Sequence, residues 1–307
     1  MRRASIDIGS NSVLLLAAEI DPMTKTIVQE YLNESFITSL GKDLDKTKCF
    51  HSESMNSTLE ALSTYKKLLE KINFPIKDVI VTATEASRVA ENAKSFYEKV
   101  KADIGFEVQV ISSEGEAHYT ALGVISSIDA NKDNHIVVMD IGGASTELIK
   151  IQIRPFKIIE SISLPLGSVR ASDWLNQGVL EEKFNEIFKI NLSSYETSTL
   201  ICVAGSMTAM ASMYLGQKVY DDQKVDGLEL SFLSFIDFAS DLQKTNVQNL
   251  LMLFPFLGKR APMVGCGSKI AVEIGKLLKI NKIKISTRGL RYGTVLAGGI
   301  DERYSNR

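Results

Sequence analysis

SIDIGSNSVLLL (residues 5–16) and VVMDIGGASTELI (residues 137–149) are two copies of one strand–turn–strand pattern. In each copy an apolar stretch ends in Asp-Ile-Gly, passes through a turn of small and hydroxyl-bearing residues, and enters a second apolar stretch. The copies are in register, because Asp140 follows Asp7 by 140 − 7 = 133 positions and Ser145 follows Ser12 by the same number. A repeated unit of this kind predicts two lobes that share one topology.

Each copy continues into alternating helices and strands. In the first half we expect three antiparallel strands at 3–9, 12–20 and 27–35, helices over 53–73, 84–104 and 113–127, and strands at 78–84 and 106–112. In the second half we expect strands at 135–140, 146–153, 157–164, 199–204 and 282–286, helices near 180–195 and 205–215, a mostly helical stretch to 278 and a last helix over 287–299. The pattern restarts near 124–135, so we predict α/β lobes at 1–125 and 126–307, with a ligand cleft between them.

Composition limits the function classes. The chain has 307 residues, 45% hydrophobic and 23% charged, with a formal net charge of −2. A nearly neutral chain argues against a DNA- or RNA-binding protein. No apolar run approaches the ~20 residues that cross a bilayer, and we read no signal peptide at the N-terminus. Cys49, Cys202 and Cys266 are far apart and odd in number, which suits reduced thiols in the cytoplasm.

The two turns carry the features of a phosphate site. Glycines at 9, 142 and 143 let a ligand approach the backbone closely. Donors to phosphate oxygens are available from Ser10, Asn11, Ser12, Ser145 and Thr146. An aspartate such as Asp140 beside a phosphate would repel it unless a cation lay between them, and Mg²⁺ commonly bridges carboxylate and phosphate oxygens. A single copy is better explained as a plain β-hairpin, but two copies in register favour phosphate binding.

Three later segments are less specific. Gly205 and Ser206 begin a helix directly after a strand, which suits either a phosphate at the helix N-terminus or an ordinary cap. Glycine-bearing helix starts at 260–275 and 285–293 could serve a ligand or a close helix contact, and both readings stay open. The basic segment 275–291 could follow a polyanion, although a solvated face is the simpler reading.

The segments SIDIGSNSV, VMDIGGASTEL, AGSMTAMA and STRGLRYG, in this order and spacing, resemble the exopolyphosphatase and guanosine pentaphosphate phosphohydrolase (Ppx/GppA) family. That family belongs to the larger actin, hexokinase and Hsp70 ATPase fold. The resemblance spans essentially the whole chain and is nearest to the short, two-lobe members. It implies an α/β fold with two actin-like (ribonuclease H-like) lobes of duplicated topology and an interlobe active-site cleft.

The resemblance also implies an activity: Mg²⁺-dependent hydrolysis of a terminal phosphoanhydride, in inorganic polyphosphate or in guanosine pentaphosphate, a nucleotide of the stringent response. Glu116 matches the catalytic base for water, although residue type alone would make it a solvated helix carboxylate. Asp140 and Glu147 match catalytic acidic residues that hold the metal or position water. The residues that match phosphate contacts are Ser10, Asn11, Ser12, Arg88, Gly142, Gly143, Ala144, Ser145, Gly205 and Ser206.

Four positions depart from the family pattern. His118 stands where an arginine is usual, Ala144 and Ala204 replace glycines of the phosphate loops, and Asp226 stands where a histidine is frequent. A protonated His118 could still contact an anion, with a charge that depends on pH, or it could be a plain surface histidine. These changes bear on rate and substrate preference more than on fold.

Two other functions stay open. One is a small-molecule kinase of the same superfamily, although the sequence shows no clear acceptor site. The other is a non-catalytic regulator that senses polyphosphate or a phosphorylated nucleotide. The expected partner is the phosphate-rich ligand, with neither nucleic acid nor membrane, and a homodimer is left open.

Overall fold

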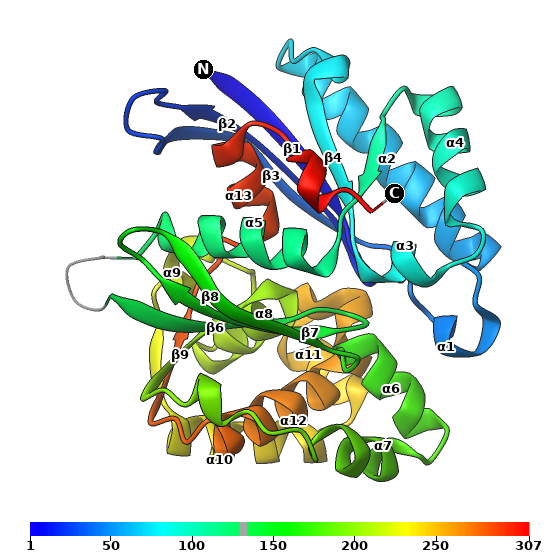
Figure 1. The fold of residues 1–307 in the computed structure, drawn as a ribbon. Coiled ribbons are helices and arrows are strands. Elements are labelled where there is room, and N and C mark those ends of the chain that lie inside the picture. The colour runs from blue at the N-terminus through cyan, green and yellow to red at the C-terminus, as the bar shows by residue number, and fades with distance from the viewer. Residues whose placement is uncertain (129–133, 307) are drawn as a thin grey trace. The chain divides into compact units, whose positions relative to one another are not determined.

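The computed structural model describes residues 1–128 and 134–306, which form two compact units (Figure 1). Unit 1 comprises Met1–Ser126 together with the residues from Arg288 onward, and unit 2 comprises Ser127–Thr287. The change of unit at Ser126 lies one residue from the predicted boundary. The sequence had placed residues 288 onward with the second lobe, whereas their contacts place them in unit 1.

Unit 1 is built on a five-stranded sheet in the order β3-β2-β1-β4-β5. β1 (Arg2–Ile8), β2 (Ser12–Ile20) and β3 (Ile27–Ile37) form the predicted antiparallel meander. β4 (Val79–Ala83) and β5 (Val108–Val110) follow parallel to β1. The carboxyl ends of these three parallel strands therefore share one edge of the sheet.

Unit 2 repeats this topology in a six-stranded sheet in the order β10-β11-β9-β6-β7-β8. Its strands are β6 (His135–Ile141), β7 (Thr146–Gln152), β8 (Lys157–Leu164), β9 (Thr199–Val203), β10 (Glu229–Ser231) and β11 (Lys282–Ile285). The series β8-β7-β6-β9-β11 corresponds to β3-β2-β1-β4-β5 in both order and direction, and β10 adds an antiparallel edge strand. The duplicated actin-like topology is confirmed, while the cleft between the lobes stays a prediction.

Helices cover both faces of the first sheet (Figure 1). The helices of unit 1 are α1 (Leu44–Thr47), α2 (Ser52–Lys71), α3 (Glu85–Val89), α4 (Ala93–Ile104), α5 (Ser113–Ile125) and α13 (Leu290–Ala297), of which the short α1 and α3 lie at the ends of strands. The predicted helix over 84–104 is broken at Ala90, where the backbone is extended. Asn92, just after the break, accepts a hydrogen bond from Phe50 N and donates one to Phe50 O. These hydrogen bonds to a distant segment stabilise the break. Local helix propensity could not predict the break, because it takes no account of distant partners.

Unit 2 has more helices than the sequence predicted. They are α6 (Ser168–Asn176), α7 (Leu180–Ile187), α8 (Ala204–Tyr214), α9 (Asp222–Val225), α10 (Phe232–Lys244), α11 (Val247–Leu253) and α12 (Ala261–Leu277). The α6 helix was not expected, and the helix predicted near 180–195 ends at Ile187. No helix in the part of the chain that the structure describes is long and apolar enough to span a membrane. All three cysteines are free thiols.

The strand β2 is buried on both of its faces. One face contributes Val13, Leu15 and Ala17 to a core with α2 and α4. The other contributes Leu16, Ala18 and Ile20 to a cluster with α13. Burial on both faces explains why VLLLAA is a continuous apolar run and not an alternating one.

The last helix, α13, packs against α5 at two glycines (Figure 1). A Cβ added at Gly293 would lie 1.8 Å from the carbonyl oxygen of Tyr119, and one added at Gly123 would lie 2.2 Å from that of Gly289. Both distances are far below any van der Waals contact. Glycine at these two positions therefore lets the helices approach closely, and α5 is fixed in unit 1 by residues from the end of the chain.

We expect Gly293→Ala to destabilise the protein by at least roughly 1–3 kcal/mol, because overpacking forces backbone to move. Gly265 is the matched control, since a Cβ there would meet its nearest atom at 3.9 Å. Gly265→Ala should be neutral or stabilising by up to ~1 kcal/mol through helix propensity. Denaturant unfolding of both variants measures the difference, and equal midpoints would contradict the close contact.

Candidate active site

In unit 1, the predicted residues gather at the carboxyl edge of the parallel strands. The turn at 9–12 follows β1, α3 follows β4 and carries Arg88, and α5 follows β5 and carries Glu116. The carboxyl edge of parallel strands is the usual ligand-binding edge of an α/β sheet. The register of the sheet therefore brings three separate sequence motifs together.

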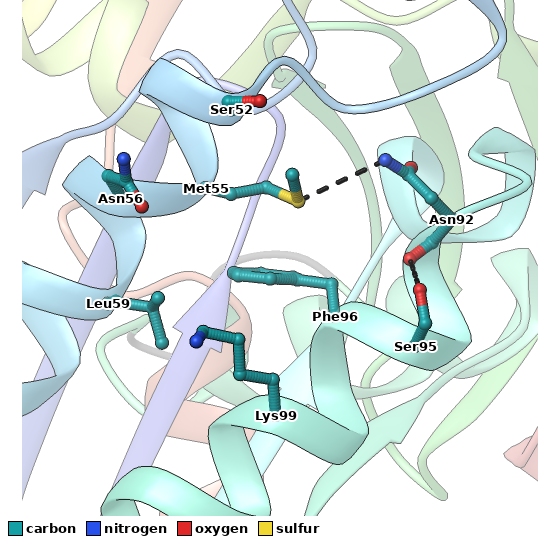
Figure 2. A pocket seen from close by; sticks show the side chains of 8 residues that line it. All are labelled: Ser52, Met55, Asn56, Leu59, Asn92, Ser95, Phe96 and Lys99. Carbon is teal, nitrogen blue, oxygen red and sulfur yellow. Dashed lines mark hydrogen bonds between the residues drawn. The ribbon is translucent and has the colours of Figure 1, made fainter.

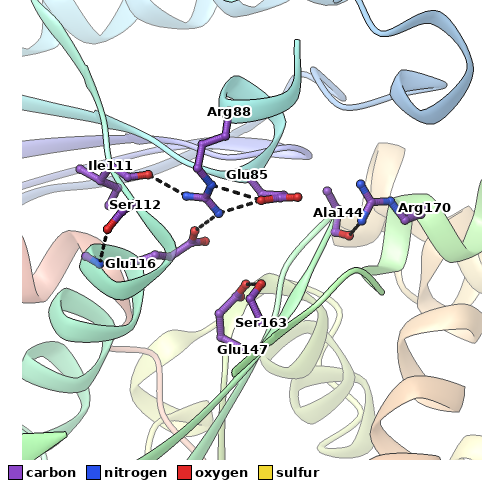
Figure 3. Close-up of polar contacts among 10 residues, drawn as sticks. Glu85, Arg88, Ile111, Ser112, Glu116, Ala144, Glu147, Ser163 and Arg170 are labelled. Atoms are coloured by element: carbon purple, nitrogen blue, oxygen red, sulfur yellow. Dashed lines mark hydrogen bonds and ion pairs between the residues drawn. The ribbon is translucent and has the colours of Figure 1, made fainter. Parts of the chain in front are cut away.

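Arg88 lies between two carboxylates (Figure 3). Its Nη2 donates to Glu116 Oε2 at 3.0 Å and to Glu85 Oε2 at 2.9 Å. Its Nε donates to Glu85 Oε2 at 3.2 Å, and its Nη1 donates to the carbonyl oxygen of Ile111 at 2.7 Å. Four hydrogen bonds fix the guanidinium, and through it they fix the side chain of Glu116.

Glu116 is buried, with only 9% of its surface exposed. Burial raises the pKa of its carboxyl, Arg88 opposes that effect, and the negative charge of Glu85 adds to it. The raised pKa makes the carboxylate a better proton acceptor than an exposed glutamate. Reading Glu116 as a solvated surface carboxylate, as residue type alone suggested, is therefore wrong.

The turn after β1 leaves backbone N–H groups available. Gly9 N donates to Ser12 O at 2.9 Å and closes the turn. The carbonyl of Ser10 accepts from Gly41 N, and that of Asn11 accepts from Thr38 N. The N–H groups of Ser10 and Asn11 have no acceptor within residues 1–128 and 134–306. The turn therefore holds its carbonyls inward and offers donors, which is the polarity that an anion needs.

The turn after β6 repeats this arrangement in unit 2. Gly142 N donates to Ser145 O at 3.0 Å. A Cβ added at Gly142 would lie 3.2 Å from Ser145 O, the same distance that separates a Cβ added at Gly9 from Ser12 O. Among residues 134–306, the N–H groups of Gly143, Ala144 and Ser145 have no acceptor. An N–H left unpaired in a buried place costs about 1–3 kcal/mol, which a bound anion would offset.

The first turn of α6 holds this second turn in place. Ser168 N donates to Gly142 O at 2.9 Å, and Val169 N donates to Gly143 O at 2.9 Å. The buried Arg170 donates from Nη1 to the carbonyl of Ala144 at 2.6 Å (Figure 3). A Cβ at Gly167 would lie 2.4 Å from the carbonyl of Gly143, so the approach requires glycine there.

Asp140 and Glu147 face one another across the β6–β7 pair. They are direct partners in the antiparallel register, and partners of this kind project from the same face of the sheet. Glu147 is only 2% exposed, and its Oε1 accepts a hydrogen bond from Ser163 Oγ at 2.7 Å (Figure 3). Two adjacent carboxylates on one face repel each other, and a divalent cation would relieve that repulsion.

Gly205 and Ser206 lie in the first turn of α8, beside the 142–145 turn, because β9 runs parallel to β6. A Cβ at Gly205 would lie 2.8 Å from Nη2 of Arg260. Burial lowers the pKa of the Arg260 guanidinium, which pairs with no carboxylate among residues 134–306. A helix N-terminus and an arginine therefore put positive potential at the same place.

The structure shows the conformation or the contacts of three residues that depart from the family pattern. Ala204 has φ +69°, a left-handed conformation in which a Cβ is strained and glycine is favoured. Asp226 Oδ1 accepts from Thr287 N and Oγ1, so it has a structural partner. The ring of His118 stacks on Tyr304, and burial together with Arg303 lowers its pKa. The ring stacking and the lowered pKa favour the plain histidine over a protonated His118 that contacts an anion.

The basic segment 275–291 is largely neutralised by acids from elsewhere in the chain. Lys276 pairs with Glu273, and Lys279 pairs with Glu196. Lys282 and Lys284 both pair with Glu229. These pairs favour the solvated-face reading over a track for a polyanion.

A surface pocket between α2 and α4 lies apart from these residues within unit 1. Figure 2 shows its lining residues: Ser52, Met55, Asn56, Leu59, Asn92, Ser95, Phe96 and Lys99. Lys99, the charged residue of this lining, forms an ion pair with Asp103. None of the predicted site residues contributes to the lining. The pocket therefore adds nothing to the candidate site.

Sequence reasoning missed four residues that contact the candidate site. Glu85 was hidden in a predicted helix and Ser163 in a predicted strand. Arg170 belongs to a helix that was not predicted at all, and Arg260 follows a kink at Gly258. The sequence Gly167-Ser168 directly after a predicted strand was a usable signal for a helix start, and hence for Arg170.

Comparison with known proteins places this geometry in context. The sequence model of the Ppx/GppA phosphatase family matches residues 18–298. The bifunctional 3-dehydroquinate synthase/phosphatase of Fusobacterium nucleatum is 31% identical over 96% of this chain and 46% of its own length. The guanosine-5'-triphosphate,3'-diphosphate pyrophosphatase of Aliivibrio fischeri is 26% identical over 97% of this chain and 59% of its own. The chain thus spans about half the length of these relatives.

The chain resembles solved structures over almost its full length. The crystal structure of the Aquifex aeolicus member of the Ppx/GppA family has a TM-score of 0.76 and 29% identity, and the match covers 97% of each chain. Its fold and the fold of this chain are the same.

We expect Glu85→Gln to lower the pKa of Glu116, because the substitution removes a neighbouring negative charge and leaves Arg88 to Glu116 alone. Titration of the Glu116 carboxyl carbon by NMR measures this change directly. Glu98→Gln, at an exposed position of α4, is the control and should leave the pKa of Glu116 unchanged. A Glu116 pKa that stays fixed or rises in Glu85→Gln would contradict the shared-arginine geometry.

Ala204→Gly is expected to stabilise the protein by roughly 1 kcal/mol, since glycine adopts a positive φ without strain. Chemical denaturation gives the change in the free energy of unfolding. The control is Ala209→Gly in the same helix, which should destabilise by about 1 kcal/mol or more from lost propensity and packing. A change in the free energy of unfolding of the same sign in both variants would contradict the strain at Ala204.

Proposed function

Because the chain belongs to the Ppx/GppA phosphatase family, we propose that it is a hydrolase that releases the terminal phosphate from a phosphoanhydride chain. The substrate is inorganic polyphosphate or guanosine pentaphosphate. The observation that carries the proposal is the buried Glu116, held by Arg88 at the strand edge where the 9–12 turn offers free N–H groups. A positioned base beside anion donors suits hydrolysis of a phosphate ester or anhydride.

Glu116 is the proposed general base. It accepts a proton from water as the water oxygen bonds to the terminal phosphorus, and the bond from that phosphorus to the bridging oxygen breaks. The products are inorganic phosphate and a chain shortened by one phosphate. The role requires an ionised Glu116, so the rate should rise with pH through the raised pKa of this carboxyl.

The two turns and the start of α8 are the proposed phosphate contacts. Ser10, Asn11 and Ser12 offer donors in unit 1, as do Gly142, Gly143, Ala144 and Ser145 in unit 2. Gly205 and Ser206 add the N-terminus of α8, and Arg260, which sequence reasoning missed, adds a guanidinium. The guanidinium of Arg88 already donates hydrogen bonds to Glu85, Glu116 and Ile111. We therefore assign Arg88 first to positioning the base Glu116 and second to contacting phosphate.

Asp140 and Glu147 are the proposed Mg²⁺ ligands. The residues fit the ion, because Mg²⁺ takes one or two carboxylates and completes its shell with water and substrate phosphates. Residues 1–128 and 134–306 contain no cluster of three or more potential metal ligands. When bound, the ion would neutralise charge on the phosphate chain.

The two substrates share a phosphoanhydride end and differ in the guanosine. The Aliivibrio fischeri relative is named for the guanosine nucleotide, whereas a Mycobacterium tuberculosis relative is named an exopolyphosphatase, so both substrates are proposed. Phosphate release from long-chain polyphosphate and from guanosine pentaphosphate, measured in parallel with Mg²⁺ and after chelation, decides between them. Release that persists after chelation would exclude the Mg²⁺ assignment.

We expect Glu116→Gln to lower kcat by roughly 10²–10⁴-fold while the substrate still binds, because the amide keeps the shape and loses the base. Phosphate release and calorimetric binding of tripolyphosphate are the two measurements. Glu114→Gln, on the same helix turn, is the matched control and should keep most of the rate. Binding without turnover by the unaltered chain would instead establish the sensor function.

A further inference from the structure

The last residues of the described chain return to the helix that carries Glu116. After α13 the backbone turns at Gly298, and residues 301–306, here called the C-terminal strap, lie along β5 and the start of α5 (Figure 1). Ser305 forms an antiparallel bridge with Ile111, and Asn306 N donates to Val110 O at 2.8 Å. The strap is therefore hydrogen-bonded to the junction between β5 and α5.

The strap and Arg88 hold the same peptide group. Ser112 N donates to the carbonyl of Tyr304 at 2.8 Å. Ile111 O, the other polar atom of that Ile111–Ser112 peptide, accepts from Arg88 Nη1 at 2.7 Å. The same guanidinium then donates to Glu116. A continuous series of hydrogen bonds thus runs from Tyr304 through one peptide and Arg88 to Glu116, and such series strengthen one another in a buried place.

Side chains of the strap also pack on the first turns of α5. A Cβ at Gly115 would lie 2.7 Å from Cβ of Tyr304, so glycine is needed for this approach. The Tyr304 ring stacks on His118 with centroids 4.8 Å apart, and Asp301 N donates to Tyr119 Oη at 2.8 Å. The strap therefore covers one side of the helix turn that presents Glu116.

We infer that the C-terminal strap is a positioning element for the catalytic base, with Tyr304 as its positioning residue. The inference rests on the proposed function, in which Glu116 activates water. The strap fixes the α5 N-terminus on one side, and Arg88 fixes it on the other. Its loss would let the first turn of α5 shift and admit water around Glu116.

A shifted base costs rate more than binding, because a misplacement of about 1 Å can cost roughly 10²-fold in turnover. The charged groups that face Glu116 are Arg88 and Glu85 of α3. From the strap, Asp301, Arg303 and Tyr304 face His118 and Tyr119. Loosening the strap should therefore change the solvation of Glu116 and leave its charged neighbours in place.

The test is a double-mutant cycle between Gly115 and Tyr304. Gly115→Ala should lower kcat at least roughly tenfold with KM changed less than about twofold, because the new Cβ meets Tyr304. In the Tyr304→Gly background the same Gly115→Ala change should have little further effect, since the opposing Cβ is gone. Glu302→Ala, in the same turn with an exposed side chain, is the control and should match the unaltered chain.

A second measurement does not depend on turnover. NMR titration should give a lower pKa for Glu116 in Tyr304→Gly than in the unaltered chain, because burial is what raises it. An equal loss of kcat from Gly115→Ala in both backgrounds, or an unchanged Glu116 pKa in Tyr304→Gly, would overturn the positioning role of the strap. An unaltered chain that releases no phosphate would refute the proposed function. The NMR titration would still decide whether the strap controls the burial of Glu116.

Discussion

The buried ion pair between Arg88 and Glu116 imposes the strongest constraint on unit 1. Removing both charges from water costs several kcal/mol per ion, and the pair is stable only when further hydrogen bonds satisfy the guanidinium. Glu85 and the carbonyl of Ile111 supply those bonds. One guanidinium then faces two carboxylates: burial raises the pKa of Glu116, Arg88 opposes that rise, and the charge of Glu85 adds a smaller rise. The contacts that stabilise the pair are thus the same contacts that tune the base.

The duplicated hairpin shows how one backbone device supports two different chemistries. In both units the turn after the first strand ties its carbonyls to the segment after the third strand, which is 38–41 in unit 1 and 167–170 in unit 2. Both turns keep their N–H groups for a ligand. The side chains then diverge, because the position that holds Glu147 in unit 2 holds Leu14 in unit 1. Unit 2 therefore carries the pair of carboxylates, and unit 1 supplies its carboxylate from α5.

Sequence patterns were sufficient for features fixed by local backbone chemistry. The strand–turn–strand copies, their register and the strands of both sheets other than β10, which lies in a stretch predicted as mostly helical, followed from apolar periodicity and from glycine at the turns. The break at Ala90, the helix α6 and the contact of Glu85 with Arg88 did not follow, because each depends on a partner distant in sequence. Glu85 and Glu116 both resemble ordinary helix carboxylates, and only the tertiary structure distinguishes them. The assignment of residues 288 onward failed for the same reason, since the glycine contacts that attach α13 to α5 join positions about 170 apart.

The return of the chain end to unit 1 also constrains how that unit forms. Arg3 donates to the carbonyls of Val295 and Leu296, and Ser5 Oγ hydrogen-bonds Thr294 Oγ1 at 2.6 Å. The first strand of the protein is thus completed by its last helix, and contacts between segments so distant close slowly because of loop entropy. Unit 2, Ser127–Thr287, is continuous in sequence and needs no such return. Tyr292, Val295 and Leu296 of α13 form one apolar cluster with β2. The complete unit 1 core therefore requires α13, which also packs against the helix that bears Glu116.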